Sequence, residues 1–240
     1  MDSQFSRSEL MFGSEGLERL YKARVAVFGI GGVGGYVVEA LVRSGLGFID
    51  IIDNDTVALS NLNRQIIATH STIGRYKVDV MEERIKDINP ECKVKIHRCF
   101  YLPENKDEFD FTEYDYVVDA IDTVSGKISL VVQANEAHTP IISSMGAGNK
   151  MHPELFEVDD IYNTSICPLA RVMRRELKKR EIKGLKVVYS KEEPVKPKSE
   201  EDTENPATRK VAPGSNAFVP SVAGLIIASE VIKDIMYKDI

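Results

Sequence analysis

A glycine-rich turn followed by an acidic strand end could hold a nucleotide. In "RVAVFGIGGVGGYVV", Gly29, Gly31 and Gly34 form a G-x-G-x-x-G pattern between an apolar run and a helical pattern. Glycines let the backbone approach a phosphate, and the N-terminus of the next helix offers N–H groups and partial positive charge. Asp53 ends the next apolar run and can accept hydrogen bonds from ribose hydroxyls. The pattern predicts a nucleotide site; the alternative is a glycine turn that only packs a helix.

Polar residues downstream favour chemistry at a triphosphate over hydride transfer. The segment "LSNLNRQ" brings Asn61, Arg64 and Gln65 together, Lys77 begins a later helix, and Asp122 follows the apolar run of "YVVDAIDT". Cations neutralise charge that builds up on phosphates, and a carboxylate can hold Mg²⁺. Each residue also has a simpler interpretation. Arg64 and Lys77 could be solvated surface charges, and Asp122 could be a helix N-cap.

Alternating strands and helices position these residues. Predicted strands cover residues 24–30, 48–53, 93–100, 116–122 and 140–148, and predicted helices cover 32–46, 76–89 and 126–138. This alternation predicts an α/β fold with a doubly wound, mostly parallel Rossmann-like sheet and helices on both faces. The nucleotide should then bind at the carboxyl ends of the strands.

The remaining segments of the chain do not follow this alternation of strands and helices. Residues 1–23 contain one or two short helices, and a basic helix is predicted over 168–186, followed by the short strand "KVVYS". The charged, proline-containing segment 190–214 cannot bury much apolar surface, so we expect it to be mobile. A last helix closes the chain.

The basic helix is a candidate RNA-binding surface. Its candidate contact residues are Arg171, Arg174, Arg175, Lys178 and Lys179. Clustered positive charge can contact RNA phosphates and release counterions. The alternative is a solvated helix whose apolar side packs on the body of the protein.

Composition excludes several classes of protein. The chain has 240 residues with 43% hydrophobic and 28% charged residues, which is typical of a globular protein. The net charge of −6 argues against a polycation that coats nucleic acid. The three cysteines form no C-x-x-C pair, so no four-thiolate zinc site is indicated. The first ten residues lack the apolar core of a secretory signal, and the late apolar stretch is interrupted by Glu230 and Lys233, so we expect a cytoplasmic protein without a membrane partner.

Several motifs, taken in order, resemble one family. "GIGGVGG", "IDNDTVALSNLNRQ", "IGRYKVDV", "INP" and "VVDAID" resemble the ThiF/MoeB/HesA enzymes and the adenylation domains of ubiquitin-activating enzymes. The resemblance implies ATP and Mg²⁺ as cofactors and adenylation of a carboxylate. It also implies one ATP-binding domain over 1–240, with a nucleotide-binding core at 24–150 and the basic helix, charged loop and last helix in 151–240.

The family resemblance also implies roles for individual residues. It implies that Gly31, Gly32 and Gly34 line the phosphate loop, that Asp53 holds the ribose, and that Asp55 lies near the reacting phosphates. It further implies that Asn61, Arg64, Gln65 and Lys77 contact the triphosphate and that Asp122 holds Mg²⁺. Asp55 could instead cap a turn. Arg7 matches an arginine that reaches into the partner's ATP site, which implies a homodimer; a mobile surface arginine is the alternative.

Motifs mostly in the second half of the sequence indicate a narrower class of substrate. "INPEC", "GAGNKMHP" and "PLARVMRRELKKR" resemble the bacterial branch of this family that dehydrates threonylcarbamoyladenosine (t6A) in tRNA. That branch implies tRNA bearing t6A as the substrate, a carboxylate of threonine as the nucleophile and possible assistance from a sulfur-relay protein. Three alternatives stay open: adenylation of the C-terminus of a sulfur-carrier protein, NAD(P)-dependent oxidoreduction, and a catalytically silent nucleotide-binding scaffold.

Overall fold

The computed structural model describes residues 3–196 and 213–237, and its centre is one seven-stranded sheet of order β3-β2-β1-β4-β5-β7-β6. The strands are β1 (Arg24–Phe28), β2 (Phe48–Ile52), β3 (Lys93–His97), β4 (Tyr116–Asp119), β5 (Ile141–Ser144), β6 (Phe156–Asp160) and β7 (Lys186–Ser190). All neighbouring strands pair in parallel except β6, which is antiparallel to β7. The predicted doubly wound, mostly parallel sheet is therefore confirmed.

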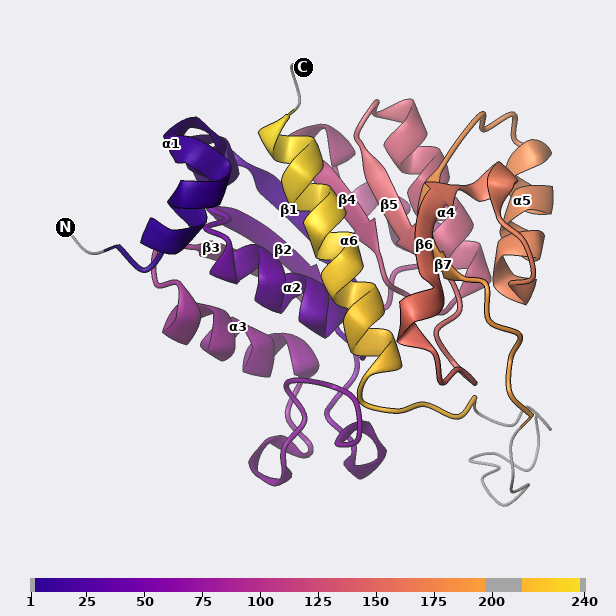
Figure 1. Cartoon of the computed structure of the whole chain (residues 1–240), viewed down its shortest axis with the longest axis horizontal. Helices are drawn as coiled ribbons and strands as arrows, with labels where there is room; N and C mark the ends of the chain where they lie inside the picture. The colour runs from indigo at the N-terminus through magenta and orange to yellow at the C-terminus, as the bar shows by residue number, and fades with distance from the viewer. Residues whose placement is uncertain (1–2, 197–212, 238–240) are drawn as a thin grey trace.

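Helices cover both faces of the sheet. They are α1 (Ser6–Lys22), α2 (Gly34–Arg43), α3 (Lys77–Ile88), α4 (Val124–Glu136), α5 (Pro168–Lys178) and α6 (Val219–Met236), with short 3₁₀ helices in the connecting loops. Figure 1 shows α2 and α6 on the near face and α4 on the far face. The alternation along β1 matches this arrangement, because Val25 and Val27 join the cluster beneath α2 and α6, whereas Ala26 and Phe28 join the cluster beneath α4.

Most predicted elements are present, with differences at their ends. β4 ends at Asp119 rather than at residue 122; the Ala120 N–H still donates to the Phe28 carbonyl of β1 at 2.9 Å, and the Ala120 carbonyl lies against Gly29. α1 is broken at Gly13, which has φ +71°, so it contains the two short helices allowed by the sequence. The charged segment 190–214 falls largely on 197–212, which lie outside the described residues.

α5 is shorter than predicted, and β6 was not predicted. α5 ends at Lys178 instead of residue 186, because the N–H of Ile182 bonds back to the Leu177 carbonyl and Glu181 adopts a φ of +58°. β6 escaped prediction because its sequence "FEVDD" is mostly polar and lies at the edge of the sheet, where only Phe156 is fully buried.

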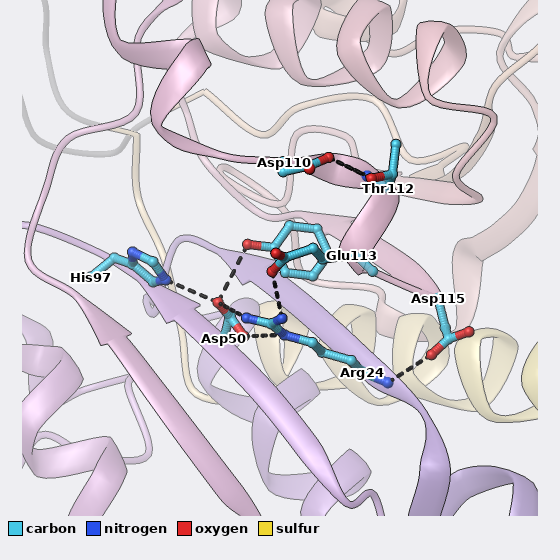
Figure 2. Close-up of polar contacts among 8 residues, drawn as sticks. Arg24, Asp50, His97, Asp110, Thr112, Glu113 and Asp115 are labelled. Carbon is cyan, nitrogen blue, oxygen red and sulfur yellow. Dashed lines mark hydrogen bonds and ion pairs between the residues drawn. The ribbon is translucent and has the colours of Figure 1, made fainter.

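A buried polar cluster joins the first three strands in sheet order (Figure 2). The carboxylate of Asp50 on β2 accepts two hydrogen bonds from Arg24 on β1, at 2.9 and 3.1 Å, and lies 2.9 Å from Nε2 of His97 on β3. Arg24 also pairs with Glu113 at 2.7 Å. Although burial alone would raise the pKa of Asp50, hydrogen bonds from His97 and Arg24 hold it below its usual value.

No helix among the described residues is long and apolar enough to cross a membrane.

Candidate nucleotide site

A cavity of about 450 Å³ lies at the carboxyl ends of the parallel strands. The loops that follow β1 to β4 and the end of β5 form its wall, as the doubly wound topology predicts. Its lining includes all the predicted cofactor-binding residues except Gly34: Gly29, Gly31, Gly32, Asp53, Asp55, Asn61, Arg64, Gln65, Lys77 and Asp122. Residues spread over almost a hundred positions of sequence therefore meet in one place.

The glycine turn lies beside the cavity, and its individual glycines are required for different structural reasons. Gly29 has φ +91°, and a Cβ on it would lie 2.6 Å from the Ala120 carbonyl oxygen. Gly31 and Gly32 line the cavity just before α2 begins, where backbone N–H groups can bind phosphate. Gly34 is absent from the lining in the described part of the chain, because it packs on Gly29: a Cβ there would lie 1.8 Å from the Gly29 carbonyl oxygen.

Asp53 connects the glycine turn with the loop after β2. Its Oδ2 accepts a hydrogen bond from the Ile30 N–H at 2.7 Å, and its Oδ1 accepts one from the Asp55 N–H at 2.8 Å. Burial raises the pKa of Asp53, although the positive charge of Lys77 opposes that shift. The carboxylate is thus held rigidly on the cavity wall, with lone pairs left for ribose hydroxyls.

Lys77 projects a buried ammonium group towards the acidic wall of the cavity. Its side chain is only 6% exposed, and Nζ lies 2.7 Å from Asp55 Oδ2 and 4.0 Å from Asp53 Oδ1. The side chain of Asp55 is 59% exposed. An anionic ligand entering the cavity can therefore replace Asp55 as the partner of Lys77, since Asp55 is free to turn to solvent.

The "NLNRQ" segment provides a cation and an unsatisfied amide. Nη1 of Arg64 donates to the Ser60 carbonyl and to Asn63 Oδ1, both at 2.9 Å, while Asn61 Oδ1 accepts from the Ala58 N–H. Gln65 is buried, and its Oε1 lacks a hydrogen-bond partner among residues 3–196 and 213–237. Gln65 lines the cavity, and because buried polar atoms are normally paired, a hydrogen-bond donor of a ligand that reaches this oxygen would satisfy it.

Asp122 lines the cavity from the loop between β4 and α4. Its side chain is exposed to the cavity, three residues beyond the end of β4. Within the described ranges no group of three or more His, Cys, Asp or Glu side chains could hold a metal ion. Mg²⁺ commonly takes one or two carboxylates together with phosphate oxygens and waters. The donor set therefore fits a magnesium ion that arrives with a nucleotide.

Two groups of predicted functional residues lie outside the cavity. Arg7 is exposed at the start of α1, so its predicted action on a partner's site stays a prediction. The exposed members of the basic set are Arg171, Arg175 and Lys178 on α5 and Lys179 directly after it. Arg174 differs from them, because its guanidinium is half-buried and donates to the Thr164 carbonyl and hydroxyl. We therefore remove Arg174 from the RNA-binding surface.

Sequence reasoning missed part of the cavity wall. Cys99, Phe100 and Tyr101 line it from the loop after β3, and Leu169 lines it from the first turn of α5. Burial raises the pKa of Tyr101 to about 12, so its hydroxyl stays protonated. The sheet topology could have indicated these cavity residues. β3 ends at His97, so the residues after it lie at the same edge of the sheet as the other loops that form the cavity.

The fold and the cavity together define a nucleotide-binding α/β protein of the doubly wound class. A family model described as the ThiF family matches residues 5–239, and this chain belongs to that family. The predicted family resemblance is thereby confirmed.

Two bacterial relatives are similar to the chain over almost their whole length. A tRNA threonylcarbamoyladenosine dehydratase of Bacillus subtilis is 46% identical, with 99% of this chain and 96% of the relative covered. The corresponding Escherichia coli protein is 34% identical, with 98% and 94% covered. Crystal structures of the E. coli enzyme TcdA superpose with a TM-score of 0.88 for the AMP complex and 0.87 for the ATP complex, each covering 98% of this chain and 94% of TcdA.

Proposed function

We propose that this chain is an ATP-dependent enzyme that adenylates the threonine carboxylate of t6A in tRNA and promotes its cyclisation. One observation carries the proposal: the cavity brings together a phosphate-binding glycine turn, two cations and two strand-end loops with carboxylates. The end-to-end similarity to dehydratases that act on this modification supports the same substrate. ATP is the nucleotide because an E. coli relative of the same fold has been crystallised with it.

The reaction needs little acid–base chemistry. The threonine carboxylate is ionised at neutral pH, and one of its oxygens attacks the α-phosphorus while pyrophosphate leaves. A nitrogen of the same modification then attacks the activated carbonyl carbon, loses its proton and expels AMP. The carboxylate oxygen departs with AMP, so the substrate loses one water overall. Catalysis then depends on positioning and on stabilising negative charge.

The cavity residues have separate roles in binding the nucleotide and in stabilising its charge. Gly31 and Gly32 offer backbone N–H groups, Arg64 and Lys77 neutralise the phosphates, and Asp53 orients the ribose. Asp122 would hold Mg²⁺, which neutralises charge on the triphosphate and on the departing pyrophosphate when it is bound. Gln65 offers its unpaired oxygen to a donor on the nucleotide.

The basic helix α5 begins at the cavity. Leu169 in the first turn of α5 lines the cavity, and the exposed cations Arg171, Arg175 and Lys178 follow on the same helix. The apolar side of α5 packs on the body through Ala170, Met173 and Leu177. Because these cations follow a cavity residue on the same helix, they could hold tRNA phosphates while the modified base enters the site.

The domain organisation, the homodimer and the sulfur-relay partner also belong to the proposal. We propose that residues 1–240 act as one ATP-binding domain and that the protein is a homodimer in which Arg7 completes the partner's site. Leu10 and Met11 on α1 are 87% and 80% exposed, which supports burial of this helix against a second chain. A sulfur-relay partner stays a prediction. Burial raises the pKa of Cys92 to about 11, which disfavours a reactive thiolate there.

The decisive experiment supplies purified protein with ATP, Mg²⁺ and tRNA bearing t6A. We expect pyrophosphate release only with modified tRNA, together with a nucleoside lighter by one water in mass spectrometry. Pyrophosphate release with a sulfur-carrier protein instead would favour the ThiF/MoeB-type alternative. Binding of a nicotinamide nucleotide in place of ATP, or ATP binding without turnover, would overturn the proposal in favour of the other two alternatives.

A further inference from the structure

A buried ion pair lies directly behind the loop that carries Asp122. Nζ of Lys127, on the first turn of α4, lies 3.0 Å from Oδ1 of Asp119, the last residue of β4. The side chains are 1% and 0% exposed. Neither residue lines the cavity, so neither belongs to the nucleotide-binding set described above.

This pair fixes the backbone that leads to Asp122. Nζ of Lys127 also donates to the Ile121 carbonyl at 3.0 Å, and Oδ1 of Asp119 accepts from the Ile121 N–H at 3.4 Å. Both peptide groups around Ile121 are therefore tied to the same buried pair. The preceding residue, Ala120, donates its N–H to Phe28 at 2.9 Å and packs on Gly29. The position of Asp122 at the cavity depends on this hydrogen-bonded path.

Stability alone does not account for the pair. Lys127 lies at the N-terminal end of a helix, where the helix dipole disfavours a positive charge. Asp119 Oδ2 and the hydroxyl of Ser143, its register partner on β5, have no hydrogen-bond partner in the described part of the chain. Because an apolar pair of similar volume is often as stable as a buried ion pair, the fixed geometry is the property that this pair adds.

We propose that Lys127, anchored by Asp119, is a positioning residue that holds Asp122 at the place where it meets Mg²⁺ on bound ATP. This inference rests on the proposed function, because it concerns the metal that accompanies ATP. Lys127 contacts neither nucleotide nor metal; it acts on the Ile121 carbonyl, one residue before the carboxylate.

The test compares ATP binding with and without metal by titration calorimetry. The variants are Lys127→Met and the double variant Asp119→Asn/Lys127→Met, which removes both charges and so leaves no uncompensated buried carboxylate. We expect Mg²⁺ to improve ATP affinity in the unmodified protein, and this improvement to fall about tenfold or more in the variants. ATP affinity in EDTA should stay unchanged, because the glycine turn, Arg64 and Lys77 are intact.

Asp50→Asn is the matched control, since Asp50 is a buried carboxylate of the same sheet that lies outside the cavity lining. It should lower the thermal midpoint without altering the effect of Mg²⁺ on ATP affinity. A folded double variant that keeps the full Mg²⁺ effect would overturn the inference while leaving the proposed function intact. Failure of the unmodified protein to bind ATP at all would overturn the proposed function and this inference with it.

Discussion

At the scale of single residues, the hydrogen bonds and ion pairs within the protein determine which cavity side chains are free to bind an anionic ligand. Lys77 forms its shorter ion pair, at 2.7 Å, with the exposed carboxylate of Asp55, and Gln65 has an oxygen without a partner in the described ranges. Asp53, in contrast, is fixed by two backbone N–H groups. The rigid Asp53 can orient the nucleoside and Lys77 can transfer its bond from Asp55 to a phosphate, whereas the Gln65 oxygen suits a hydrogen-bond donor of the nucleotide.

Arg64→Ala should separate catalysis from folding. Among the described residues, the guanidinium bonds only to nearby groups of its own loop, the Ser60 carbonyl and Asn63, so its loss should leave the thermal midpoint nearly unchanged. Removing a cation from the phosphates should lower kcat by about a hundredfold. Pyrophosphate release measures the rate, and Arg75→Ala, an exposed arginine outside the cavity lining, is the control. Normal ATP consumption by folded Arg64→Ala would contradict its proposed role.

At the scale of elements, the sequence predicted the strands and helices that carry strong periodic patterns, and it predicted the motif residues of the site. It could not predict β6, because three of its five residues are acidic. It overextended α5, because the segment 179–186, in which four of eight residues are basic, continues a helical pattern whose end is set by the left-handed Glu181. The cavity residues 99–101 escaped because their place follows from where strands end, which motifs alone do not specify.

The outer face of α5 should carry the salt dependence of tRNA binding. Arg171 and Lys178 are exposed on that face, so Arg171→Gln/Lys178→Gln should weaken tRNA binding and reduce the slope of log Kd against log salt by about one per lost phosphate contact. Filter binding over a range of KCl concentrations gives the slope. Lys93→Gln/Lys95→Gln, on the far edge strand β3, is the control. An unchanged slope in the α5 variant would show that tRNA binds elsewhere.

The Asp50 cluster should make the stability of the sheet sensitive to acid. The pKa of Asp50 is lowered in the folded protein, so its stabilising effect is complete above its unfolded value of about 4 and is lost as the pH falls through the folded value. At pH 7, Asp50→Asn should cost about 3 kcal/mol of unfolding free energy. Urea denaturation between pH 7 and pH 3 should show this difference shrinking on the acid side. A difference that stays constant over that range would contradict the interpretation.

At the scale of the whole molecule, the arrangement of α1 bears on assembly. α1 packs on α6 (Figure 1). Both helices carry exposed apolar side chains, Leu10 and Met11 on α1 and Leu225 on α6. Arg7 lies on the same helix as Leu10 and Met11, on a surface outside its own cavity lining. A dimer that buries this surface would carry Arg7 towards the other chain, and each active site would then require both subunits.

Mixing two inactive variants tests that shared site. Arg7→Ala and Arg64→Ala should each abolish most activity alone. In a mixed dimer, one site would combine an intact Arg64 with the partner's intact Arg7, while the other site would lack both. Random exchange at equal concentrations makes half of the dimers mixed, so about a quarter of the sites should regain full activity. Pyrophosphate release after mixing measures the recovery, and mass photometry verifies the dimer. Exchanged dimers that stay inactive, or an active Arg7→Ala protein, would show that Arg7 does not act across the interface.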